Sequence, residues 1–142
     1  MTTTSVDPAR IITQYEAFWN AGTSGEQRRI ADDVFIDEIE YRAVPGVWHG
    51  VNSMISFRDR FVDHVGAVTY RARTEPDHHH DRARLRWELV LADGTSFAEG
   101  TDILAFNADG RITSVTAFLD RAPAEGPADQ HVQWNRHAPQ RR

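Results

Sequence analysis

Apolar and polar residues alternate with two different periods along the chain, and the period changes near its middle. In the first half, apolar residues recur at helical spacing. The first apolar helical face consists of Ile11, Ile12, Tyr15, Phe18 and Trp19. Asp7 and Pro8 are typical of a helix start, as N-cap and first-turn residue, and Gly22 is placed to end this helix.

Two more helices and a strand are predicted before the period changes. Ser24 and Gln27 have the spacing of a capping box, which predicts a short helix over residues 25–32. Residues 34–41 alternate and are rich in β-forming side chains, so we expect a strand there. Residues 51–65 return to helical spacing and predict a longer helix.

The second half of the chain predicts an antiparallel meander. Its four expected strands are residues 67–74, 80–91, 95–106 and 111–120. Asp93-Gly94 and Asp109-Gly110 are strong hairpin signals between them. Helices followed by a meander favour an α+β fold. We expect one domain over residues 1–122 and a Pro-, Ala- and polar-rich tail over residues 123–142.

Composition narrows the function classes. The 142 residues suit one domain, and 40% of them are hydrophobic, which is enough for a core. A formal charge of -5 argues against nucleic acid or an anionic membrane as partner. The absence of cysteine and lysine excludes thiolate and Schiff-base chemistry. No signal peptide or membrane-spanning run is visible, so we expect a cytoplasmic protein.

Several local strings carry a family resemblance. They are "YEAFWNAG", "ADDVFID", "VWHG" and "EGTDILAFNADGRITSVTAFLD". Together with the order of elements, they resemble the SnoaL-like and ketosteroid-isomerase-like groups of the nuclear transport factor 2 superfamily, over residues 8–120. The resemblance implies a cone-shaped, cystatin-like half-barrel in which three N-terminal helices pack on a strongly curved, mostly antiparallel sheet. It also implies an apolar pocket at the open end and a homodimer formed through the outer sheet face.

The same resemblance implies three catalytic residues. Ketosteroid isomerases hold a dienolate oxygen with a tyrosine and a protonated aspartic acid, and move the proton with an aspartate base. The matching positions are Tyr15, Asp102 and, for the base, Glu38. Glu38 departs from the family pattern, in which aspartate is followed by proline, because Ile39 follows it here.

The residues themselves allow both functional and structural interpretations. Asp102 is in phase with Gly100 and Leu104 on a strand face, where burial is expected to raise its pKa. Asp102 is either a protonated acid that holds the substrate oxygen or a structural carboxylate that backbone amides or an arginine hold in place. Tyr15 is either part of the site or a core aromatic with a hydrogen-bond partner. Glu38 shares its phase with apolar residues, which would partly desolvate it, or else it faces solvent.

Secondary candidates surround this trio. The expected apolar walls are Trp19, Phe57, Phe61, Trp87 and Phe118. His49 is either a general base or a helix cap. Three consecutive strand residues cannot all bind one ion, so His78–His80 is interpreted as a polar strand start or turn, with His80 near the cavity mouth. We therefore expect no metal and no organic cofactor.

These observations lead to competing function hypotheses. The first is a cofactor-independent isomerase, cyclase or dehydratase that acts next to a carbonyl of a hydrophobic, polyketide- or steroid-like compound. The second is a non-catalytic domain that binds an apolar small molecule or a protein. The third is a domain whose pocket is filled by its own side chains. They differ in whether Tyr15, Glu38 and Asp102 converge on one open cavity.

Overall fold

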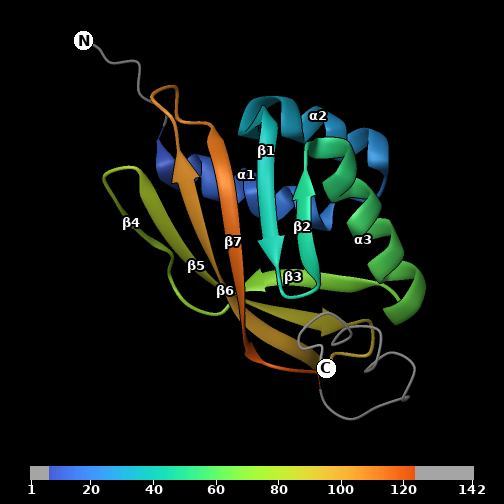
Figure 1. Ribbon diagram of the computed structural model, residues 1–142. Coiled ribbons are helices and arrows are strands. Elements are labelled where there is room, and N and C mark those ends of the chain that lie inside the picture. The colour runs from blue at the N-terminus through green and yellow to red at the C-terminus, as the bar shows by residue number, and fades with distance from the viewer. Residues whose placement is uncertain (1–6, 124–142) are drawn as a thin grey trace, which may run out of the picture.

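Three helices and seven strands form the part of the chain that the structure, a computed structural model, describes: residues 7–123. The helices are α1 (Pro8–Asn20), α2 (Ser24–Val34) and α3 (Val51–Val65). The strands are β1 (Phe35–Ala43), β2 (Gly46–His49), β3 (Val68–Ala72), β4 (Asp77–His79), β5 (Arg82–Leu91), β6 (Ser96–Phe106) and β7 (Ile112–Arg121). Figure 1 shows their arrangement. Most of the predicted tail, residues 124–142, lies outside the described residues.

The first two helices begin at side-chain caps. Asp7 Oδ1 accepts a hydrogen bond from the Ala9 amide at 3.1 Å, so the predicted start of α1 is confirmed. The capping pair of α2 was misplaced by one residue: Thr23 Oγ1 accepts from the Glu26 amide at 3.1 Å. Gln27 is instead fully buried, and its Nε2 donates to the Phe18 carbonyl at 3.1 Å. This residue ties α2 to α1 rather than capping α2.

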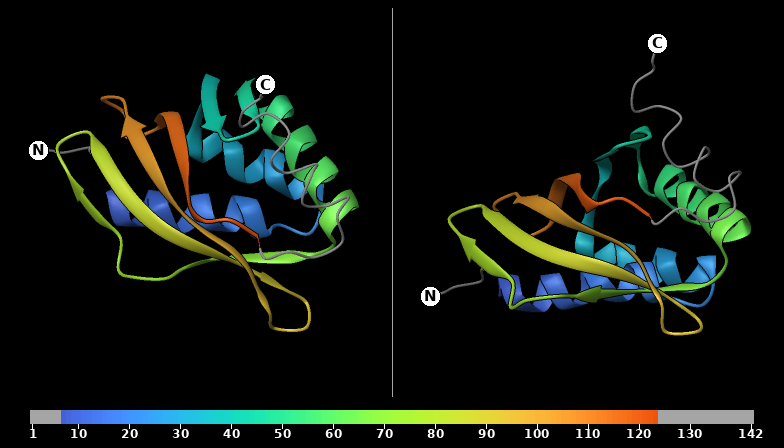
Figure 2. Two further views of the ribbon diagram at one scale, coloured as in Figure 1. Left: turned by 60° about the horizontal axis from the view of Figure 1, so that its bottom comes forward. Right: turned by 90° about the horizontal axis from the view of Figure 1, so that it is seen from below.

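The strands form one open, curved sheet. Their order is β2-β1-β7-β6-β5-β3, with β4 paired to β5. β1 runs parallel to β7, and every other pair is antiparallel. α1 and α2 lie along one face of the sheet, and α3 stands beside its β1–β2 end (Figure 2). The predicted half-barrel, with three helices on a mostly antiparallel sheet, is confirmed.

The two predicted hairpin turns are present, whereas the predicted strands differ from the observed ones in two places. Gly94 and Gly110 have φ angles of 91° and 85°, which the predicted Asp-Gly turns require. β2 was not predicted, because its four residues are too few to show a period. The strand predicted over 80–91 begins at Arg82 instead, since His80 has a φ of 52° and lies in the turn between β4 and β5, and the short β4 before it was not predicted. No helix among residues 7–123 is long and apolar enough to cross a membrane.

Candidate functional site

A buried carboxylate lies at the centre of the core. Asp102 is in the middle of β6, and its side chain is only 1% exposed. Its neighbours on the same strand face, Gly100 and Leu104, are also buried, as the alternation of the sequence predicts. A carboxyl group at such a position is costly unless hydrogen bonds satisfy its oxygens.

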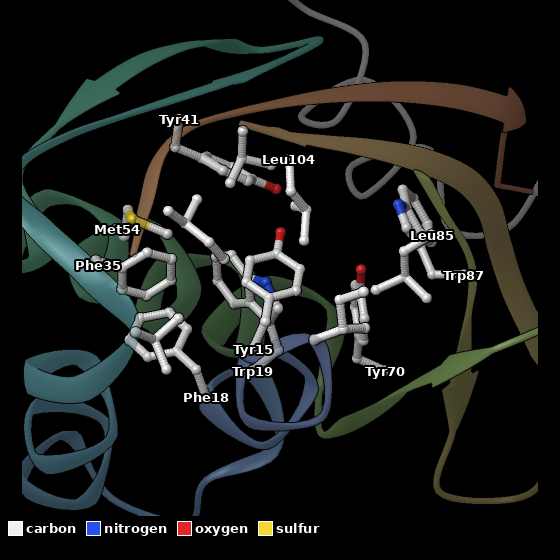
Figure 3. Close-up of a cluster of buried hydrophobic side chains, with 14 of the residues drawn as sticks. Tyr15, Phe18, Trp19, Phe35, Tyr41, Met54, Tyr70, Leu85, Trp87 and Leu104 are labelled. Carbon is white, nitrogen blue, oxygen red and sulfur yellow. The ribbon is translucent and has the colours of Figure 1, made fainter. Parts of the chain in front are cut away.

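Three donors satisfy Asp102. The Tyr15 hydroxyl donates to Oδ2 at 2.6 Å, and the Tyr70 hydroxyl donates to the same oxygen at 2.7 Å. The Trp87 indole Nε1 donates to Oδ1 at 2.7 Å. Figure 3 shows the polar ends of these three aromatic side chains pointing toward one another from α1, β3 and β5. We call Asp102 and its three donors the Asp102 cluster.

The protonation states follow from this environment. Burial raises the pKa of Asp102 from 3.8 to about 6, while the hydrogen bonds from its three donors oppose that rise. Burial, together with the nearby carboxylate, raises the pKa of Tyr15 and of Tyr70 well above 10. Both phenols therefore remain protonated donors, and Asp102 exchanges its proton close to neutral pH.

Among residues 7–123, no arginine pairs with Asp102. Arg84 and Arg86 are exposed, on the opposite face of β5 from Leu85, which pairs with Asp102. Arg84 instead binds Asp77 through its Nη2 at 2.7 Å. The structure thus favours a carboxyl group held by neutral donors over an ion pair.

Strand register positions the indole donor. Trp87 on β5 pairs with Gly100 on β6, one alternation away from the Leu85–Asp102 pair, so both side chains occupy the inner face. A Cβ at Gly100 would lie 2.1 Å from the Trp87 ring and 2.4 Å from the Phe118 carbonyl oxygen. The ring therefore lies across the backbone of β6, which requires glycine at position 100.

An apolar pocket adjoins the Asp102 cluster. The residues that line it are Trp19, Tyr41, Ala43, Val44, Phe57, Arg58, Phe61, Val62, Val68, Tyr70, Trp87, Leu89, Ala117, Phe118 and Leu119. Tyr70 and Trp87 belong both to this lining and to the Asp102 cluster. Tyr15 and Asp102 themselves are not in the lining. The pocket thus reaches the buried carboxylate through Tyr70 and Trp87.

Most of the residues that the sequence predicted for the site lie in the pocket lining or in the Asp102 cluster. Five of them contribute to the pocket lining: Trp19, Phe57, Phe61, Trp87 and Phe118. Phe118 remains 55% exposed. Tyr15 and Asp102 contact each other directly. Whether any of these residues acts in catalysis stays a prediction.

Glu38 is not brought to the other two predicted catalytic residues. Its side chain is exposed and is not part of the pocket lining, so the expectation that it shares an apolar face is wrong. The reason is an irregularity in β1: Phe35 pairs with Ile112, and Glu40 already pairs with Ser114. The extra residues of β1 bulge between these two pairs and break the alternation that the prediction assumed.

The histidine candidates are also exposed. His49 Nε2 lies 3.3 Å from Glu40 Oε2, away from the pocket lining. His80 occupies the β4–β5 turn, where its Nδ1 lies 3.0 Å from His79 Nδ1, and the expectation that it enters the cavity mouth is wrong. In the described part of the chain, no group of three or more His, Cys, Asp or Glu side chains could hold a metal ion.

Sequence reasoning missed two tyrosines and an arginine of the site. Tyr70 donates to Asp102, and Tyr41 lines the pocket with its pKa raised well above 10 by burial and by the Asp102 charge. Alternation places Tyr70 between Val68 and Ala72 on one strand face, so the argument applied to Tyr15 would have identified it. Arg58, also in the lining, lies on a helix with many charged residues and carries no such signal.

The chain is similar to known proteins in its fold, as the solved structures show. No protein-family model matches the chain, and no curated protein matches it. Among solved structures, one described as a proposed isomerase of the SnoaL-like family from Agrobacterium tumefaciens is 25% identical, with a TM-score of 0.74 over 79% of this chain and 96% of that one.

Two further structures are similar at lower identity. A nuclear transport factor 2-like protein of unknown function from Exiguobacterium is 23% identical, with a TM-score of 0.61 over 78% of this chain and 98% of that one. A proposed SnoaL-like polyketide cyclase from Jannaschia is 11% identical, with a TM-score of 0.65 over 84% of this chain and 90% of that one.

Proposed function

Because the chain belongs to the SnoaL-like, nuclear transport factor 2-like superfamily, we propose that it catalyses proton transfer next to a carbonyl group of a hydrophobic compound. A polyketide- or steroid-like ring system suits the aromatic lining of the pocket. One observation carries the proposal: Tyr70 lines the pocket and donates its hydroxyl hydrogen to the buried Asp102 carboxylate at 2.7 Å. Such a reaction needs no cofactor.

Asp102 is the proton acceptor in this proposal, and Tyr70 relays the proton to it. The carbon–hydrogen bond beside the carbonyl breaks, and its proton goes to the Tyr70 oxygen as the proton of Tyr70 goes to Asp102 Oδ2. The electron pair delocalises onto the carbonyl oxygen and forms an enolate. Return of the proton to another atom completes an isomerisation. The two transfers are concerted because the raised pKa of Tyr70 disfavours a free tyrosinate.

The other tyrosines have different roles. Tyr41 lines the pocket as a protonated phenol, so its hydroxyl can donate a hydrogen bond to the developing enolate oxygen. Tyr15 is fully buried and touches Asp102 rather than the pocket, so it is a positioning residue. Glu38, which is exposed, takes no part in this version of the reaction.

Solvent exchange of a probe ketone tests the proposal. With 2-tetralone in D₂O, NMR follows loss of the acidic protons next to the carbonyl. We expect wild-type protein to accelerate this exchange, and Asp102→Asn to lower the acceleration about a hundredfold, within the range of general acid–base effects. Asp59→Asn, an exposed aspartate on α3, is the matched control, and Glu38→Gln tests the base that the sequence suggested. Exchange no faster than in buffer, or an unaffected Asp102→Asn variant, would refute the proposal.

A second candidate function is non-catalytic binding of an apolar molecule. It is favoured by the pocket lining, which contains no carboxylate and no histidine among the described residues. In this case a hydrophobic ketone binds the pocket, and Ala117→Trp, which fills it, weakens the binding. The proton exchange rate then stays at the level of buffer in every variant.

A further inference from the structure

The side chain of Arg58 lines the apolar pocket, and its charge indicates which ligands the pocket can bind. We infer that the pocket takes a hydrophobic carboxylate, whose charged end pairs with Arg58. This inference rests on the proposed use of the pocket as a ligand site. It adds a property of the ligand that neither the carbonyl chemistry nor the fold requires.

Arg58 differs from the rest of the pocket. Of the described residues in the lining, it alone carries a full charge; the others are aliphatic or aromatic, including two protonated tyrosines. It lies on α3, where its helical neighbours Phe61 and Val62, one turn further on, also line the pocket. The side chain is half-buried. A guanidinium in this setting loses part of its hydration, and a paired anion would offset that loss.

The guanidinium of Arg58 has donors to spare. Its Nη2 donates to the Ala21 carbonyl at 2.5 Å, which fixes the side chain against the end of α1. A guanidinium carries five N–H groups, so this bond uses only one. Within residues 7–123, no carboxylate forms a salt bridge with Arg58.

The other arginines show the contrast. Six of them form salt bridges with Asp or Glu side chains: Arg42, Arg71, Arg73, Arg82, Arg84 and Arg121. None of these six lines the apolar pocket. The arginine that does line it is thus left with unused donors where a ligand would lie.

The chemistry of the pocket selects the class of anion. The fork of N–H groups on a guanidinium matches the two oxygens of a carboxylate. A single carboxylate costs less to desolvate than a doubly charged phosphate, which suits walls made of side chains such as Trp19 and Phe57. A ring system can then fill the apolar pocket between Arg58 and Tyr70, which both line it.

A matched pair of probes tests the inference. 2-Naphthoate and 2-naphthamide share one ring system and differ in charge, and their dissociation constants are measurable by NMR titration or calorimetry. We expect wild-type protein to bind the naphthoate about tenfold more tightly, as 1.4 kcal/mol of extra binding free energy gives. Arg58→Gln lowers naphthoate affinity more than naphthamide affinity, so that the preference disappears. Arg60→Gln, an exposed arginine on the same helix, keeps the preference.

The outcomes separate this inference from the proposed function. Equal affinity of wild-type protein for the two probes, or an equal loss of both in Arg58→Gln, overturns the carboxylate inference alone. Binding of neither probe at millimolar concentration overturns the pocket as a ligand site, and the inference with it. A preference that persists in Ala117→Trp, which blocks the pocket, places the anion elsewhere and also overturns the inference.

Discussion

The Tyr15 hydroxyl and the Asp102 carboxylate, 87 positions apart in the sequence, meet at 2.6 Å inside the core. The contact joins α1 to the central strand β6, in a place where neither group reaches solvent. Hydrogen bonds to a buried charge are stronger than those between neutral groups, and an unsatisfied partner costs more. This hydrogen bond therefore helps to hold α1 against the sheet, and it also lowers the pKa of Asp102.

The stability of the protein is expected to depend on the protonation of Asp102. Its pKa rises from 3.8 to about 6 on folding, so the folded state favours the neutral acid. The associated stability is fully present below pH 4 and is lost as the pH rises through 6. The pKa difference amounts to roughly 3 kcal/mol of unfolding free energy. Asp102→Asn, which is neutral throughout, should lack this contribution.

Denaturant unfolding of both proteins between pH 4 and pH 8 measures the effect. The relevant quantity is the wild-type unfolding free energy minus that of Asp102→Asn, because the other carboxylates then cancel. We expect this difference to decrease with rising pH. A difference that is flat, or that increases with pH, would contradict a raised Asp102 pKa.

Removing a single phenol should raise the pKa of Asp102 further. Each of the hydrogen bonds from Tyr15 and Tyr70 opposes the effect of burial, so Tyr15→Phe and Tyr70→Phe both favour the neutral acid. The loss of stability should be larger at pH 8, where a bond to a charged group worth about 1.5–3 kcal/mol is lost, than at pH 4. Carboxyl titration by ¹³C NMR checks the pKa. Tyr41→Phe, which removes no hydrogen bond to Asp102, serves as control.

Gly100→Ala should disturb the indole donor. The new Cβ would lie 2.1 Å from the Trp87 ring, which has to move or force the strands apart. We expect a loss of about 1–3 kcal/mol of unfolding free energy, typical of overpacking, and a change in tryptophan fluorescence. Gly22→Ala is the matched control, because nothing lies within 4 Å of its added Cβ. Equal stability of the two variants would show that the close packing of Trp87 on β6 is not needed.

Local signals predicted most of the fold. The helix over residues 51–65 was predicted with its observed bounds, because a strong period ends at Gly66, which has a φ of 98°. The two Asp-Gly turns fixed the meander of β5, β6 and β7. β2 could not be predicted, since its four residues are stabilised by pairing with β1 rather than by a pattern of their own. Tertiary pairing of this kind leaves no local trace.

The site was only partly predictable, for a related reason. Alternation along β6 is regular around Asp102, so its burial followed from the sequence. Alternation along β1 is interrupted between Phe35 and Glu40, so the same argument failed for Glu38. The interruption depends on how β1 pairs with β7, which is distant in sequence. The resemblance to ketosteroid isomerases likewise pointed to Tyr15 but not to Tyr70, which completes the hydrogen bonding of Asp102.

The outer face of the sheet carries the last prediction, a homodimer. Phe118, which also contributes to the pocket lining, pairs with Thr101, as Arg86 does on the other side, and Val47 pairs with Arg42. Apolar and charged residues therefore share the sheet face opposite the helices. Phe118 is 55% exposed and Val47 is 46% exposed, and these two are the exposed large hydrophobic residues of the described part of the chain. Exposed apolar residues that share a face with arginines are typical of an interface between proteins.

Phe118→Asp should dissociate this dimer, because each copy would lose an apolar contact and would have to remove a carboxylate from water at the interface. Sedimentation equilibrium at micromolar concentration is expected to give twice the 16.1 kDa chain mass for the wild type and a single chain mass for the variant. Arg60→Asp, a charge change on α3 away from the sheet, should leave the dimer intact. A monomeric wild-type protein would contradict the prediction outright. A dimer that survives Phe118→Asp but not Arg60→Asp would move the interface from the sheet to the helix.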